Sequence, residues 1–120
     1  MDEEEVIKIL CAWLEAQGWE TGVSRNGPDI VATRHVGKRA EIWIVEAKGA
    51  PKLRQQRGNY FLNVLGQILQ RMDSCEKKYS VAFPDVKPYT DLWDRIPRCA
   101  KHRTCITALF VSKKMVREVF

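Results

Sequence analysis

The sequence predicts a single α/β domain over residues 1–120, in which helices flank a mixed central sheet of about five strands. Apolar residues recur at three- and four-residue steps in two long segments, which is the period of an amphipathic helix. Short runs rich in β-branched and aromatic residues lie between and after these segments, bounded by glycine or proline. A length of 120 residues suits one domain with an ordinary core.

The N-terminal half is expected to hold one helix and three strands. The helix covers residues 2–17, where acidic residues at its start suit the helix dipole. An edge strand follows at residues 19–24. Two further strands, at residues 29–32 and about 40–48, are joined by a polar turn over residues 35–39. Hairpins of this kind make neighbouring strands antiparallel.

The C-terminal half alternates helices and strands. The strongest helix of the chain is expected over residues 58–73, followed by a short buried strand at 78–83. A shorter helix at about 89–99 precedes a last strand at 104–111, and the basic tail at 113–120 has no assigned structure. Because helical crossovers favour parallel pairing, the sheet is mixed, with the core order α-β-β-β-α-β.

Composition and charge narrow the class of partner. The chain is 45% hydrophobic and 29% charged, as in soluble globular proteins, and its net charge of +5 favours a polyanionic partner such as nucleic acid. The N-terminus is acidic, unlike a signal peptide, and no apolar run is long enough to span a bilayer. We therefore expect a cytoplasmic protein that does not enter membranes.

The stretch GPDIVATRHVGKRAEIWIVEAKG carries the most distinctive chemistry. Asp29 opens one strand after Pro28, while Glu46 and Lys48 end the next strand and share one of its faces. Charged groups at the end of an apolar strand face are costly unless they are paired or bind a metal ion. One alternative is structural: an exposed strand end with a Glu–Lys pair and an aspartate in a turn.

The chemical interpretation is a divalent-metal site. Mg²⁺ prefers hard oxygen ligands and usually takes one or two carboxylates, which Asp29 and Glu46 supply from neighbouring strands. Lys48 lies one side chain further along and can meet a phosphate oxygen or a metal-bound water. This set suits metal-assisted phosphodiester hydrolysis.

Basic residues around this stretch are candidates for contacts with nucleic-acid phosphates. Lys52, Arg54 and Arg57 follow the second strand directly and would lie at the mouth of the site. Arg25 stands in the turn that leads into Asp29. The alternative for each is a solvated loop residue.

Two polar residues border the apolar stripe of the long helix. Gln67 and Arg71 are four residues apart and therefore neighbours on the helix surface. A glutamine at this border can reach the end of a sheet, and Arg71 is a further candidate for a phosphate contact. A merely polar border is the alternative for Gln67.

The pattern PD…ExK resembles the signature of the PD-(D/E)xK nuclease superfamily. Asp29, Glu46 and Lys48 match its three core positions, and GPDIVA…IWIVEAKG looks most like archaeal Holliday-junction resolvases and Mrr-type endonuclease domains. The resemblance covers about residues 3–83 and implies a restriction-endonuclease-like fold. It also implies a Mg²⁺-dependent endonuclease that hydrolyses phosphodiester bonds in DNA, with Mn²⁺ able to substitute.

Further site residues follow from the same resemblance. The Ala47 backbone carbonyl would be a third metal ligand, and Gln67 looks like a glutamine that such families place beside the active site. Their first helix often carries a glutamate for the metal, but the matching position here falls near Ile7. Glu3, one turn earlier on the same face, is the candidate, with a solvated helix start as its alternative.

The resemblance also bears on substrate and assembly. Because 120 residues leave no separate specificity domain, a structure-directed or loosely sequence-specific substrate is expected. Resolvase-like domains cut two strands as dimers, which implies a homodimer. The alternative function is a non-catalytic nucleic-acid-binding or interaction module that retains the nuclease fold.

Overall fold

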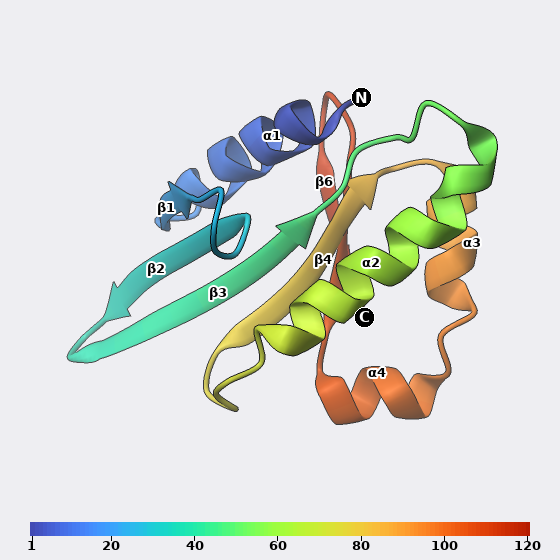
Figure 1. Ribbon diagram of the computed structural model, residues 1–120. Helices are drawn as coiled ribbons and strands as arrows, with labels where there is room; N and C mark the ends of the chain where they lie inside the picture. The colour runs from blue at the N-terminus through green and yellow to red at the C-terminus, as the bar shows by residue number, and fades with distance from the viewer.

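The computed structural model describes the backbone of all 120 residues and every side chain except that of Arg54. Helices cover both faces of one mixed sheet (Figure 1). The helices are α1 (Glu3–Glu15), the 3-10 turn η1 (Arg54–Gln56), α2 (Arg57–Gln70), α3 (Lys87–Asp94) and α4 (Arg98–Thr104). The strands are β1 (Glu20–Val23), β2 (Ile30–Val36), β3 (Arg39–Ala47), β4 (Lys78–Pro84), β5 (Thr107–Val111) and β6 (Val116–Val119).

The strands lie side by side in sequence order. β1, β2 and β3 form an antiparallel meander, β3, β4 and β5 are parallel, and β6 returns antiparallel to β5. Helix α2 connects β3 to β4, and α3 and α4 connect β4 to β5. The predicted α/β class and the core order α-β-β-β-α-β are confirmed.

Three local predictions need correction. The sheet has six strands, because the C-terminal tail supplies β6. The expected turn over residues 35–39 shrinks to Gly37 and Lys38, since β2 continues to Val36 and Gly37 adopts a φ of +63°. The single helix expected at 89–99 is two helices, because Pro97 has extended backbone angles and becomes the N-cap of α4.

Two apolar layers hold the sheet between helices. On one face, Val6, Leu10 and Leu14 of α1 pack against strand residues that include Trp43 and Val45. On the other face, α2 and α3 cover a second cluster, which includes strand residues such as Ile44, Val81 and Phe83. The alternation of side chains along β3 therefore directs Glu46 to the face that α2 covers. None of the described helices has both the length and the apolar composition needed to cross a bilayer.

Candidate functional site

The carboxylate of Asp29 is fixed by the backbone of the neighbouring strand. Asp29 immediately precedes β2, and the antiparallel register pairs Ile30 with Val45. Asp29 is thereby brought opposite Glu46, and its Oδ2 atom accepts a hydrogen bond from the Ala47 backbone N–H at 2.9 Å. The hairpin thus brings the two predicted metal-binding carboxylates together, although they are 17 residues apart in the sequence.

Glu46 is a buried carboxylate with an arginine partner. Its side chain is 3% exposed, and Arg71 donates from Nε to Oε1 at 2.9 Å. Burial is the largest influence and raises the pKa of Glu46, the hydrogen bond from Arg71 lowers it, and Asp29 raises it again. The resulting pKa is about 7, so a substantial fraction of Glu46 carries a proton at neutral pH.

Lys48 lies just past the end of β3 and faces the start of α1. Its Nζ atom is 3.6 Å from Oε1 of Glu3 and 4.7 Å from the ring centroid of Tyr60. Its backbone N–H donates to the Ala82 carbonyl at 3.0 Å, which prolongs the parallel pairing of β3 with β4. Both charged side chains are about one-third to two-fifths exposed, so the ammonium group can exchange partners.

Gly49 explains why α1 and the end of β3 come so close. A Cβ atom at this position would clash with the backbone of Asp2 and Glu3. The Ala50 N–H donates to the Met1 carbonyl at 2.9 Å, and Tyr89 donates to the Gly49 carbonyl at 3.1 Å. Burial is the main reason that the pKa of Tyr89 is raised to about 12, so its hydroxyl stays a donor.

A concave surface of about 570 Å³ opens beside Lys48. Glu3, Lys48, Lys52 and Tyr60 contribute to its wall, together with backbone from residues 49 and 50. Asp29 and Glu46 are not among the residues described in this wall. Asp29 lies opposite Glu46 and Lys48 pairs with Glu3, and no hydrogen bond or ion pair joins the two pairs among the described side chains.

The remaining predicted site residues occupy different surroundings. Glu3, expected near the metal ligands, contacts Lys48. Gln67 is exposed on α2, and no hydrogen bond of its side chain occurs among the described residues. Ala47 is buried at the end of β3, with its N–H engaged by Asp29.

The residues expected to bind phosphate also differ in exposure and in their partners. Arg25 and Lys52 are exposed, and Arg57, the first residue of α2, is half-buried. Arg71 donates its Nε–H to Glu46, so only its terminal guanidinium nitrogens remain for a phosphate in this conformation. The side chain of Arg54 lies outside the described residues.

The donor set of Asp29 and Glu46 fits a hard divalent cation. The two carboxylates offer oxygen ligands, and the pKa of Glu46 is raised mainly by burial, which the hydrogen bond from Arg71 offsets only partly. A cation would share Glu46 with the guanidinium or displace it. No cluster of three or more His, Cys, Asp or Glu side chains suited to a metal occurs in the described residues, so a site here would draw its remaining ligands from backbone, water or substrate.

Sequence reasoning missed the partner of Arg71 and the contributions of Tyr60 and Tyr89. Arg71 was a candidate for phosphate, yet its partner Glu46 lies 25 residues away, and only the rotation of α2 about its axis decides that contact. Tyr60 and Tyr89 support Lys48 and Gly49 from two helices. Both tyrosines belong to apolar stripes in the sequence, which hides the use of the Tyr89 hydroxyl.

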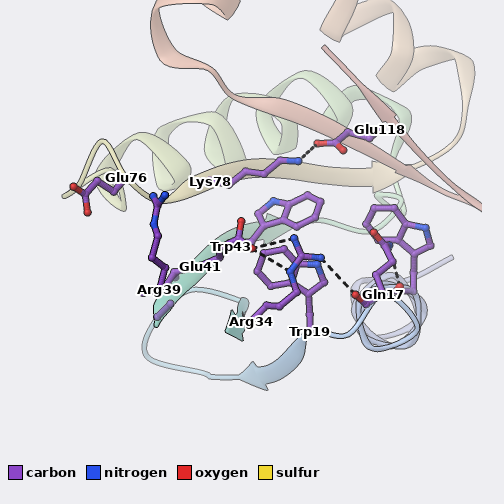
Figure 2. Close-up of a pocket in the computed structure, with 12 residues that line it drawn as sticks. Gln17, Trp19, Arg34, Arg39, Glu41, Trp43, Glu76, Lys78 and Glu118 are labelled. Carbon is purple, nitrogen blue, oxygen red and sulfur yellow. Dashed lines mark hydrogen bonds and ion pairs between the residues drawn. The ribbon is translucent and has the colours of Figure 1, made fainter. Parts of the chain in front are cut away.

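A second concave surface, of about 540 Å³, lies at the opposite end of β3 (Figure 2). Trp13 and Trp19 meet Trp43 edge to face, with centroid separations of 5.8 and 5.6 Å. Arg34 lies 4.3 Å from the ring centroid of Trp19, and Lys78 lies 3.9 Å from that of Trp43. Figure 2 shows that these two cations are also paired, Arg34 with Glu41 and Lys78 with Glu118.

Beneath this surface, a chain of hydrogen bonds crosses four strands. The Trp43 indole N–H donates to Ser80 Oγ at 2.8 Å, and Ser80 is hydrogen-bonded to Thr107. Thr107 then donates to Glu118 Oε2 at 2.8 Å, and Lys78 lies 2.7 Å from the same oxygen. Trp43, Ser80, Thr107 and Glu118 thus all have hydrogen-bond partners in this series.

Comparisons with known proteins support the fold. No protein-family model matches the chain, and no curated protein is similar to it in sequence. The crystal structure of an XisH family protein from Nostoc punctiforme PCC 73102 has a TM-score of 0.54 to this chain, with 18% identity over 98% of each chain. An fdxN element excision controlling factor protein from Anabaena variabilis gives a TM-score of 0.50, with 16% identity and the same coverage. At such identities the likeness shows a shared fold alone.

Proposed function

We propose that this protein is a divalent-metal-dependent endonuclease that hydrolyses phosphodiester bonds in DNA, a member of the PD-(D/E)xK superfamily. The pairing of Asp29 with a buried Glu46 at the end of β3 carries this proposal, with Lys48 two residues further along. A carboxylate that is 3% exposed and lies beside another carboxylate is costly to maintain unless a cation uses it.

Each residue of the proposed site would have a separate role in phosphodiester hydrolysis. Asp29 and Glu46 would hold the cation, with the Ala47 carbonyl as a third ligand. When bound, such a cation acidifies a water molecule and neutralises charge that develops on the phosphate. Lys48 would leave Glu3 and donate a hydrogen bond to the attacking water or to a phosphate oxygen. A water oxygen bonds to phosphorus while the bond to the leaving sugar oxygen breaks, and the leaving oxygen takes up a proton.

Two further observations support DNA as the partner. One structural neighbour is described as a factor that controls excision of the fdxN element, which supports a DNA-related role. The net charge of +5 favours a polyanion. We expect a structure-directed or loosely sequence-specific substrate, and Gln67 would position water or Lys48 from α2.

Cutting both strands of a duplex or junction calls for two such sites, so we expect a homodimer. Sedimentation velocity with and without DNA measures this directly. A protein that stays monomeric on a branched substrate and nicks one strand would contradict the expected assembly, but not the chemistry.

The decisive experiment combines metal binding with cleavage. We expect Mg²⁺ or Mn²⁺ to raise the melting temperature of the wild type by mass action, and branched, nicked, single- or double-stranded DNA to be cut in their presence. Asp29→Asn and Glu46→Gln should abolish both effects and keep the fold. Glu41→Gln is the matched control, because Glu41 is an exposed carboxylate on the same strand that pairs with Arg34. No cleavage and no metal effect in the wild type would refute the proposal.

One contact favours a second function, that of a non-catalytic nucleic-acid-binding module. Arg71 already supplies Glu46 with positive charge, as a structural ion pair would. In that case Arg71→Gln would destabilise the fold, because it leaves a buried carboxylate unpaired. DNA binding would be unchanged by EDTA, and Mn²⁺ would leave the melting temperature unchanged.

A further inference from the structure

The segment around α4 is strongly basic and carries no compensating acid. Residues 95–104 contain four Lys or Arg, one His and no Asp or Glu. Among the described side chains, none of these cations takes part in an ion pair, whereas other basic residues of the chain do. Lys101 is held in place by the Trp93 ring, whose centroid lies 4.7 Å from its Nζ atom. This density of unbalanced positive charge predicts an anionic partner.

A pocket of about 460 Å³ lies between this helix and the C-terminal end of β6. Arg98, Lys101 and His102 line one side, and Ile106 and Phe120 line another. Phe120 is 79% exposed, more than any other large apolar side chain described. The register that pairs Ala108 with Val119 brings Phe120 beside the start of β5, next to the end of α4 (Figure 1).

The location of this pocket separates it from the candidate metal site. β3, β4 and β5 are parallel, so the start of β5 lies at the opposite end of the sheet from the end of β3, where Glu46 lies. No residue described in the pocket wall also lines the surface beside Lys48. A ligand here would therefore be held well away from the cleavage site.

We propose that this pocket binds one nucleotide of single-stranded nucleic acid, with the phosphate against Arg98 and Lys101 and the base stacked on Phe120. Arg98 and Lys101 form no ion pair among the described side chains and so can bind an anion, and an exposed aromatic ring selects a ligand with a flat apolar face. A base paired within a duplex cannot offer that face, whereas a single strand can. This proposal rests on the proposed function only in taking nucleic acid as the partner. If it is right, the pocket would lead the protein to prefer branched or partly unpaired substrates.

Fluorescence anisotropy with a labelled 12-nucleotide oligothymidylate, in EDTA to prevent cleavage, tests the pocket. The double variant Arg98→Gln/Lys101→Gln should weaken binding and reduce the slope of log affinity against log salt by about 0.7, because one phosphate of the single strand is no longer neutralised. Phe120→Ala should weaken binding about 5- to 100-fold with an unchanged salt slope, the scale of one lost base–aromatic stack. Its affinity for a blunt 12-base-pair duplex should stay the same.

The matched control is Lys113→Gln/Lys114→Gln, which removes the same charge from exposed residues at the opposite end of β5. Wild-type affinity in Phe120→Ala, or equal losses in the two double variants, would overturn the proposal. Equal competition by polyglutamate would do so as well, because it would indicate an acidic protein as the partner. Circular dichroism checks that each variant is folded.

The two proposals fail separately. If Asp29→Asn and Glu46→Gln abolish cleavage but the pocket variants bind normally, only the pocket proposal is wrong. If the wild type binds the oligonucleotide through Phe120 but neither binds metal nor cleaves, the nuclease proposal is wrong and the pocket proposal stands.

Discussion

Polar groups are buried at both ends of β3, near Glu46 at its end and near Trp43 towards its beginning. The two regions differ in how completely these groups are paired. Around Trp43, its own indole and the hydroxyls of Ser80 and Thr107 each have a partner, and the two cations over the rings have carboxylates of their own. Around Glu46, Arg71 donates a hydrogen bond to only one of two neighbouring carboxylates, and burial raises the pKa of Glu46 to about 7. Complete pairing suits a structural role, whereas a partly compensated buried charge is a feature of sites that bind or react.

The largest expected difference between the two ends is in pH dependence. Because the pKa of Glu46 is raised from 4.5 to about 7 on folding, the folded state binds more protons in this window and stability falls as pH rises through it. The loss amounts to about 3 kcal/mol. Urea unfolding between pH 4 and 8 should show this decline in wild type and in Glu41→Gln, but not in Glu46→Gln. A similar decline in Glu46→Gln would place its origin elsewhere.

Metal affinity should follow the same group. Binding requires ionised Glu46, so the affinity for Mn²⁺ should rise about tenfold per pH unit below 7 and level off above it. Isothermal titration calorimetry measures this profile.

Two lysines provide the next comparison, because each pairs with a glutamate and lies over an aromatic ring. Lys48→Ala should lower single-turnover cleavage by about 10²-fold or more, the scale of one transition-state contact, and leave DNA binding in Ca²⁺ nearly unchanged. Lys78→Ala should leave cleavage intact and cost about 1 kcal/mol of stability through Glu118 and Trp43. Equal cleavage by both variants would remove Lys48 from the catalytic assignment.

The last comparison concerns the hydrogen bonds that run from Trp43 through Ser80 and Thr107 to Glu118. Thr107→Val should cost about 1–3 kcal/mol in urea unfolding, because Ser80 loses an acceptor and Glu118 a donor. Thr90→Val is the control, since its hydroxyl bonds only to the Lys87 carbonyl of the same helix at an exposed position. Equal destabilisation by the two substitutions would mean that the buried hydrogen bonds of Thr107 contribute no more to stability than the exposed one of Thr90.

Sequence periodicity predicts the helices and strands whose apolar residues recur at a regular spacing. The stripes of α1 and α2 and the β-rich runs of β3, β4 and β5 are long enough to predict, and so is the approach of Asp29 to Glu46, which a hairpin enforces. β6 is too short and too charged to recognise without its partner β5. The split at Pro97 follows from backbone angles that a longer helical pattern conceals.

The side-chain partners in the site were harder to predict for a physical reason. Glu46 with Arg71 and Lys48 with Glu3 join residues 25 and 45 positions apart. Such contacts depend on where a helix begins and how it is rotated on the sheet, and a rotation of one residue changes them entirely. Local sequence thus predicts the carboxylates and the lysine as site candidates, but it does not reveal which neighbours contact them.

The close approach at Gly49 has a consequence for the time course of folding. Met1, Ala50 and Tyr89 meet there through contacts between segments 40 or more residues apart, so long loops must close before any of them forms. The hairpin of β2 and β3 needs far shorter loops and can form early. We therefore expect the wall beside Lys48 to be completed late in folding and to open first in hydrogen exchange, while Asp29 and Glu46 are still held together by their hairpin.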